Sequence, residues 1–191
     1  MKVFYTNLQF NGDSLVSHVK GLDMVITNDV WVAVAGLKFS GVRINRGNLG
    51  VVEEFNKMQF YKSCLKNPLS KVRNIFVGGL KLDERLIAFI VSWIITPRGS
   101  NHFTLPEEDL LLIYCIMKKV KINWFHTIKE HMQKSIRLCA FHYPYAILIY
   151  KFLHYFEVDI EEELPEIIKP SSEINRGSLS KRGLLKLVGD G

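Results

Sequence analysis

The sequence has too few cysteines for a disulfide-stapled domain and no hydrophobic run long enough to span a membrane. Its three cysteines, Cys64, Cys115 and Cys139, are scattered along 191 residues, which excludes a disulfide framework. The longest apolar run, Leu86 to Ile95, has ten residues, whereas a membrane span needs about 20. No apolar stretch typical of a signal peptide follows Met1. We therefore expect an intracellular protein with no membrane span, in which the apolar run forms a buried core helix.

The spacing motifs that identify many enzymes are also missing. The sequence has no GxxxxGK, GxGxxG, GxSxG or CxxC pattern, so it lacks the usual signatures of phosphate loops, dinucleotide-binding folds, α/β-hydrolases and zinc ribbons. We expect no catalytic residue, no metal and no cofactor. An enzymatic alternative would need one of two polar groups, which are the loop from Arg98 to His102 and the set His126, Glu130, His131, Cys139 and His142.

Positive charge dominates most of the chain. Residues 1–156 hold 20 basic and 11 acidic residues, whereas residues 157–191 hold 5 basic and 8 acidic ones. A basic body favours anionic partners such as nucleic acid. The basic residues form three clusters along the sequence, and the third follows the aromatic pair Trp124 and Phe125. The clusters are Lys57, Lys62, Lys66, Lys71 and Arg73; Lys118, Lys119 and Lys121; and Lys129, Lys134 and Arg137.

These clusters support two interpretations. Lysine and arginine side chains can neutralise phosphates while exposed aromatic rings stack on bases, so the first interpretation is a non-catalytic domain that binds nucleic acid weakly or assembles with itself. The same lysines can simply solvate helix faces, in which case the chain is a protein-interaction or structural module with no nucleic-acid role. No known DNA-binding or RNA-binding signature decides between them.

The first part of the chain predicts a small β-meander. Residues 3–10, 14–19 and 22–27 favour strands, and the Asn11-Gly12 pair is typical of a hairpin turn. Residues 29–35 predict a short helix that ends at Gly36, although their valines leave a strand as an alternative. Residues 40–50 are rich in Gly and Asn and predict a loop.

The rest of the body predicts helices. The sequence therefore predicts one α+β domain, mostly α, over residues 1–157, with a small N-terminal antiparallel meander followed by about five helices. Residues 158–191 predict a mobile tail that is first acidic and then basic. The expected helices are 51–67 with the stripe Phe55, Met58, Tyr61 and Leu65; 86–95 capped by Asp83; 110–117 opened by a Thr104–Glu107 capping box; 124–138 capped by Asn123; and one from Pro144 to about Phe156.

A family resemblance runs along the same body. Three segments resemble, in their order along the chain, the plant transposon protein domain: the opening VFYTNLQF, the stretch SWIITPRGSNHFTLPEEDLLLIYCIMKKVKINWFHTIKEHM and the later YPYAILIYKFLHYFEVDIEEE. This family derives from plant retrotransposons, and related frames are sometimes labelled envelope-like. The resemblance covers roughly residues 1–165 and implies a non-enzymatic domain of unknown function with no catalytic residues to carry over. Family members carry more chain before the VFYTNL stretch, so it also implies that Met1 heads a truncated frame.

Overall fold

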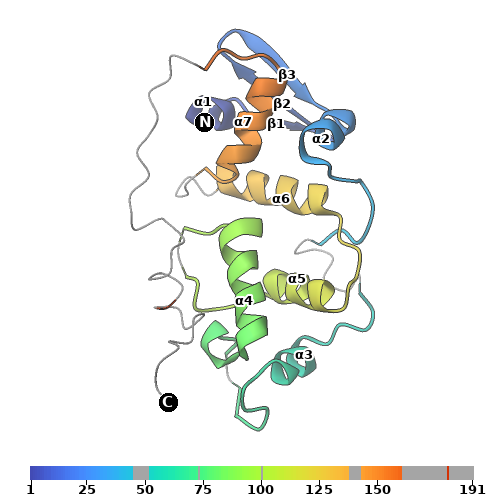
Figure 1. The fold of residues 1–191 in the computed structure, drawn as a ribbon, viewed down its shortest axis with the longest axis vertical. Coiled ribbons are helices and arrows are strands. Elements are labelled where there is room, and N and C mark those ends of the chain that lie inside the picture. Colours follow the sequence, from blue (N-terminus) through green and yellow to red (C-terminus); the bar gives the residue numbers. More distant parts are fainter. Residues whose placement is uncertain (45–51, 73, 100, 138–142, 161–179, 181–191) are drawn as a thin grey trace.

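The fold is α+β and mostly helical, as the sequence predicts (Figure 1). The computed structural model describes residues 1–44, 52–72, 74–99, 101–137, 143–160 and 180. The elements are α1 (Lys2–Thr6), β1 (Gln9–Asn11), β2 (Ser14–Val19), β3 (Leu22–Ile26), α2 (Asn28–Ala35), α3 (Lys57–Ser63), the 3₁₀ turn η2 (Val77–Gly79), α4 (Leu82–Ile90), the π-helical turn η3 (Val91–Ile95), α5 (Glu107–Met117), α6 (Trp124–Arg137) and α7 (Ala146–Tyr155).

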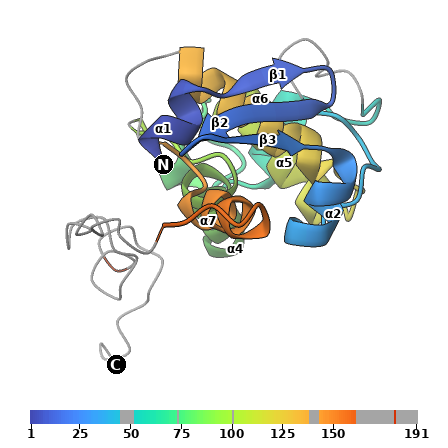
Figure 2. The same cartoon turned by 90° about the horizontal axis from the view of Figure 1, so that it is seen from above.

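The predicted meander is present as a three-stranded antiparallel sheet in the order β1-β2-β3. Its register pairs Leu15 with Ile26 and Ser17 with Met24. The buried side chains alternate along β2 and β3, so one face of the sheet packs on the core. Viewed from above, this sheet lies over α6 and beside α7 (Figure 2), and its buried residues join those of both helices in one hydrophobic cluster.

The start of the first predicted strand is wrong, because residues 2–6 form the helix α1. Phe4 and Tyr5 are both buried, whereas neighbouring residues of a strand point to opposite faces of the sheet. Tyr5 also donates its hydroxyl to the Pro144 carbonyl oxygen at 2.6 Å. This contact reaches across most of the chain, and a local pattern cannot contain it.

The core is divided between two hydrophobic clusters, which we call the middle tier and the terminal tier. The middle tier holds α3, α4 and α5, and its apolar residues come from the described positions between 42 and 124. The terminal tier holds the sheet, α1, α2, α6 and α7, and its residues come from positions 4–39 and 125–160. The middle tier is therefore inserted, in sequence, between the two halves of the terminal tier (Figure 1).

Several helix ends follow local signals. Gly36 ends α2 in the left-handed conformation with a φ of 65°, as predicted. Asn123 precedes α6, and its side-chain oxygen accepts from the His126 backbone N–H at 3.0 Å, so the predicted cap is confirmed. The helix predicted over 51–67 is shorter than expected, because Asn56 caps α3 by accepting from the Gln59 N–H at 3.0 Å.

Two predicted caps are wrong. Lys81, and not Asp83, precedes α4, so Asp83 lies in the first turn of that helix. Thr104 does not open α5, because its hydroxyl donates to the Asn101 side chain at 3.1 Å and its backbone pairs with Phe76. Both differences arise because contacts between segments, and not the nearest polar residue, decide where a helix begins.

The apolar run 86–95 is also only partly buried, contrary to the prediction. Ala88 and Val91 belong to the middle tier and Phe89 is buried, whereas Leu86 and Ile90 are exposed. Across the described residues, no helix combines the length and the apolar character that crossing a membrane requires. Part of the predicted loop 40–50 and most of the predicted tail lie outside the described residues, at positions 45–50, 161–179 and 181–191.

Candidate functional site

Some of the basic residues singled out by the sequence bind acidic or carbonyl partners within the fold. Lys129 lies over the Phe125 ring, 5.6 Å from its centre, and donates to the Gly12 carbonyl oxygen. Such side chains bind a phosphate of a nucleic acid less favourably, because binding it would break an existing ion pair or hydrogen bond. The ion pairs are Lys57 with Glu107 at 3.0 Å, Lys129 with Asp13 at 3.7 Å, and Lys134 with Glu108.

The remaining predicted basic residues point into solvent from two regions and one helix end. Arg73 lies outside the described residues. Within the described part of the chain, no acidic partner pairs with the lysines after α5, so their charge is uncompensated. The exposed residues are Lys62, Lys66 and Lys71 on α3 and the segment after it, Lys118, Lys119 and Lys121 after α5, and Arg137 at the end of α6.

The lysines after α5 border a groove, which we call the basic groove. It has a volume of about 440 Å³ and lies between the segment that leaves α2 and the connection from α5 to α6. These segments run side by side at the right of Figure 1. Lys119 and Lys121 line one wall and Lys38 the other, and Trp124 adds an aromatic ring. None of the described residues that line the groove is acidic.

Backbone pairing fixes the width of the basic groove. The Val42 N–H donates to the Lys121 carbonyl oxygen at 2.8 Å, and the Asn123 N–H donates to the Val42 carbonyl oxygen at 2.9 Å. This approach needs Gly41, which has a φ of 113° and leaves no room for a Cβ beside the Lys121 carbonyl. The two walls are therefore held in register although about 80 residues separate them in sequence.

Cys115 lines the floor of the same groove but is unsuited to nucleophilic chemistry. Its side chain is buried, and burial raises the pKa of the thiol to about 11. Because the reactive form of cysteine is the thiolate, a thiol with this pKa stays protonated and inert at neutral pH. The basic groove thus offers binding groups, and its cysteine acts as a small apolar residue.

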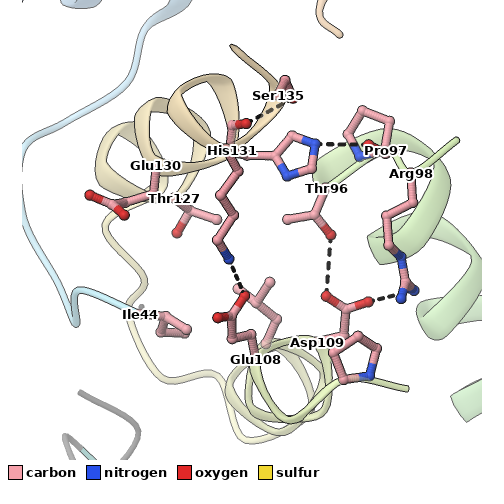
Figure 3. A pocket seen from close by; sticks show the side chains of 13 residues that line it. Ile44, Thr96, Pro97, Arg98, Glu108, Asp109, Thr127, Glu130, His131 and Ser135 are labelled. Carbon is pink, nitrogen blue, oxygen red and sulfur yellow. Dashed lines mark hydrogen bonds and ion pairs between the residues drawn. The ribbon is translucent and has the colours of Figure 1, made fainter. Parts of the chain in front are cut away.

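A second hollow, which we call the seam cavity, lies between α5 and α6 where the two tiers meet (Figure 3). Its volume is about 240 Å³. Figure 3 shows α6 above and α5 below, with the residues that follow η3 closing one side. Side chains of both signs point into it, and each of its two cations has a carboxylate partner from another helix. The partners are Asp109 for Arg98, at 2.7 Å, and Glu108 for Lys134.

Burial controls the electrostatics of the seam cavity. The side chains of Arg98 and Asp109 keep only 17% and 6% of their area exposed. Burial raises the pKa of Asp109, and the attraction of Arg98 offsets only part of this rise. Thr96 also donates its hydroxyl to Asp109 at 3.4 Å. The pair therefore joins the end of η3 to the start of α5 across a poorly hydrated gap, and we assign it a structural role.

His131 serves the same seam. Its Nε2 lies 2.8 Å from the Pro97 carbonyl oxygen, and because a carbonyl only accepts, Nε2 carries the proton. Burial lowers the pKa of His131 to about 4, so the ring is neutral at neutral pH. Tyr145 donates to the Ile95 carbonyl oxygen at 2.6 Å. These two bonds attach α6 and the start of α7 to the residues around the end of η3.

The structure brings the polar groups considered for an enzyme together only in part, because Arg98, Glu130 and His131 line the seam cavity. Arg98 pairs with Asp109, while His102 stacks on Trp93 with ring centres 3.9 Å apart. Within the described residues, no group of three or more His, Cys, Asp or Glu side chains could hold a metal ion. Ser100, Cys139 and His142 lie outside the described residues.

The sequence predicted the lysines on only one of the two walls of the basic groove. It singled out Lys119 and Lys121 but missed Lys38, which carries no neighbouring basic residue in the sequence. The predicted helix end at Gly36 places Lys38 beyond α2, but only the pairing of Val42 with Lys121 brings it to the groove.

Searches of protein-family models, curated proteins and solved structures found no match to this chain, so the resemblance to the plant transposon protein domain stays a prediction.

Proposed function

We propose that this chain is a non-catalytic nucleic-acid-binding domain of retroelement origin that holds the backbone of single-stranded RNA or DNA in the basic groove. The observation that carries the proposal is the lining of that groove. Its only charged side chains among the described residues are three lysines, Lys38, Lys119 and Lys121, and Trp124, half-buried against the middle tier, also lines it. Lysines along a groove follow a phosphate backbone, and an aromatic ring offers a surface for a base.

The seam cavity supports the choice of the basic groove by contrast. Arg98 and Lys134 in the seam are each paired with a carboxylate, so a phosphate entering there would compete with Asp109 and Glu108. Lysines without such partners can neutralise phosphates, and so release the counterions condensed on the nucleic acid, without first breaking an ion pair. Cys64 and Cys115 are buried free thiols, which supports an intracellular, reducing location.

The number of lysines sets the expected salt dependence. Three lysines line the groove and Lys118 adjoins them, so binding a single strand would neutralise three to four phosphates. The affinity should then fall about 20- to 50-fold between 50 and 200 mM salt, because the logarithm of the binding constant falls by about 0.7 per neutralised phosphate for each tenfold rise in salt. Fluorescence anisotropy with a labelled 20-nucleotide RNA measures this slope.

A matched pair of variants locates the binding. Lys119→Ala/Lys121→Ala removes two charges from the groove, and Lys62→Ala/Lys66→Ala removes one charge from α3 and one from the segment that follows it. We expect the first variant to lose at least tenfold in affinity at 100 mM salt and the second to lose about two-fold. Equal losses would show that only net charge matters, and no binding of the wild type at 50 mM salt would refute the proposed function.

A protein-interaction module is the second candidate function. It is favoured by the exposed aliphatic residues on α4, which a nucleic-acid-binding role does not use. The two functions are compatible, because the basic groove and α4 use different residues.

A further inference from the structure

The outer face of α4 and η3 carries a continuous stripe of aliphatic side chains. Leu82, Leu86, Ile90 and Ile94 follow one another at four-residue spacing and keep 40%, 45%, 37% and 54% of their area exposed. Single exposed apolar residues are ordinary on protein surfaces, whereas a contiguous apolar stripe marks an interaction surface. No charged residue interrupts this stripe from Leu86 to Ile94.

The π-helical turn keeps the stripe straight. On an α-helix, four residues advance by slightly more than one turn, so a four-residue stripe drifts around the helix axis. In η3 the turn is wider, as shown by the bond from the Thr96 N–H to the Val91 carbonyl oxygen at 2.7 Å. A wider turn reverses the drift, and Ile94 therefore stays on the face set by Leu86 and Ile90.

The loop after η3 carries a further exposed apolar residue. His102 stacks on Trp93 of η3, and Phe103, the next residue in the chain, keeps 82% of its area exposed. Leu82, Leu86, Ile90 and Ile94 form the stripe that we call the apolar face.

We propose that the apolar face binds the apolar face of a second copy of this chain, with the two α4 helices antiparallel across a two-fold axis. A two-fold interface uses the same patch on both copies, so the patch must complement itself. Antiparallel pairing places Leu82 of each copy against Ile94 of the other, and Leu86 against Ile90. Every layer then joins two branched aliphatic side chains of similar size, and a second copy offers a stripe of matching length.

The distribution of charge favours this orientation. The charged residues of α4 are Asp83, Glu84 and Arg85, all in its first half, and no charge follows until Arg98. Antiparallel pairing sets the charged end of each helix against the uncharged end of the other, and it opposes the helix dipoles favourably.

The size of the apolar face sets the expected affinity. An interface made of one helix face from each copy lies at the low end of specific interfaces, below about 1,200 Å² in total. We therefore expect a reversible dimer with a dissociation constant of about 10 to 500 μM. Such a dimer forms at high local concentration and dissociates on dilution.

Sedimentation velocity of the full chain tests the proposal. Nuclease-treated protein at about 500 mM salt excludes bridging by nucleic acid, and the concentration runs from about 5 μM to 1 mM to span the expected constant. We expect the wild type to shift from monomer to dimer and Leu86→Glu/Ile90→Glu to remain a monomer throughout. Leu69→Glu/Ile147→Glu changes two other exposed apolar residues, at 93% and 77% exposure, and should dimerise like the wild type.

Three outcomes would overturn the proposal. A wild type that stays monomeric at the highest concentration has no such interface. A Leu86→Glu/Ile90→Glu variant that dimerises like the wild type uses another surface, and equal weakening by the control variant shows non-specific apolar association. Circular dichroism of each variant confirms that it is folded, so a loss of dimer is not a loss of fold.

Disulfide trapping tests the orientation separately. Leu86→Cys and Ile90→Cys are made as two single variants in a Cys139→Ser background. Cys64 and Cys115 can stay, because both are buried and do not compete for disulfide formation. Antiparallel pairing predicts that the mixture forms several-fold more of the mixed 86–90 disulfide than of either symmetric product. An excess of the symmetric products would indicate parallel helices and contradict the proposed arrangement.

Discussion

Removing the cation from the buried Arg98–Asp109 pair is the most direct test of the seam between the tiers. Arg98→Met keeps most of the side-chain volume but leaves the Asp109 carboxylate buried, with Thr96 as its only hydrogen-bond donor among the described residues. Asp109→Leu leaves the Arg98 guanidinium buried without its carboxylate partner. Each single variant therefore leaves a buried charge without its counter-ion, which is far more costly than the pair itself.

The expected magnitude follows from the geometry. At 2.7 Å and an effective dielectric constant of about 20, the attraction between two unit charges is about 6 kcal/mol. Desolvation opposes it, and the raised pKa of Asp109 shows that at this carboxyl burial outweighs the attraction of Arg98. Because Arg98 keeps 17% of its side chain exposed, we expect each single variant to lose about 2 to 4 kcal/mol and the double variant Arg98→Met/Asp109→Leu about 1 kcal/mol or less.

Urea unfolding of the four proteins at pH 7 completes a double-mutant cycle. The cycle should give a coupling of at least 2 kcal/mol.

The pH dependence of the free energy of unfolding is a second readout. Without Arg98 the pKa of Asp109 should rise further, and a carboxyl with a raised folded-state pKa favours the folded state most at low pH and loses this contribution as pH rises through that pKa. The deficit of Arg98→Met should therefore shrink as pH falls from 7 towards 4. Single-variant losses below about 1 kcal/mol, or losses that simply add in the double variant, would refute a buried, coupled pair.

Three further predictions concern single residues. Burial lowers the pKa of His131 from 6.5 to about 4, so the unfolded chain binds the proton at a higher pH than the folded one. The free energy of unfolding should therefore fall by up to about 3 kcal/mol as pH falls through this window. His131→Gln should remove most of this loss in urea unfolding at pH 6.5 and pH 4, and an unchanged loss in the variant would contradict the prediction. Gly41→Ala should lower the free energy of unfolding by about 1 to 3 kcal/mol in thermal unfolding, because the φ of 113° at Gly41 and the nearby Lys121 carbonyl exclude a side chain. The same variant should weaken RNA binding measured by anisotropy. Wild-type behaviour in both assays would argue against a groove of fixed width. Asn123→Ala should cost about 1 kcal/mol through loss of the bond to the His126 N–H, and Asn123→Ser should cost less in the same unfolding assay, whereas equal costs would assign the effect to packing.

Parts of the fold that depend on neighbouring residues could be predicted from the sequence. Gly36 ends α2 because a left-handed residue favours glycine, and Asn123 opens α6 because its side chain replaces a missing backbone acceptor. The core helix α5 follows from its uninterrupted apolar residues from Leu110 to Cys115, all of which are buried. In each case the signal and the structure lie within one or two turns of chain.

Other parts depend on contacts that local patterns do not contain. Residues 3–10 resemble a strand, but Phe4 and Tyr5 are drawn to the same core by α6, α7 and the Pro144 carbonyl. Leu86 and Ile90 were expected in the core because they belong to an apolar run, and only the position of α5 decides which face of α4 is covered. A pattern shows that a helix is apolar, but it does not show how many partners that helix has.

The candidate site divides in the same way. Lys119 and Lys121 could be found from the sequence, because they form a dense cluster after a helix end. Lys38 could not, since its place in the basic groove depends on the pairing of Val42 with Lys121. The same holds for the seam, where Arg98 and Asp109 lie on two segments that meet only in the fold.

The insertion of the middle tier into the terminal tier sets an order for folding. Trp31 and Phe125 have ring centres 5.2 Å apart, and closing the loop of about 90 residues between them carries an entropy cost that grows with loop length. Once the middle tier is folded, the pairing of Val42 with Lys121 brings the two ends of that loop together. During synthesis the sheet and α2 leave the ribosome before the middle tier, whereas their partners α6 and α7 leave after it. The apolar face of the newly made sheet therefore stays exposed until α6 and α7 have been synthesised. During this interval the nascent chain most needs a chaperone.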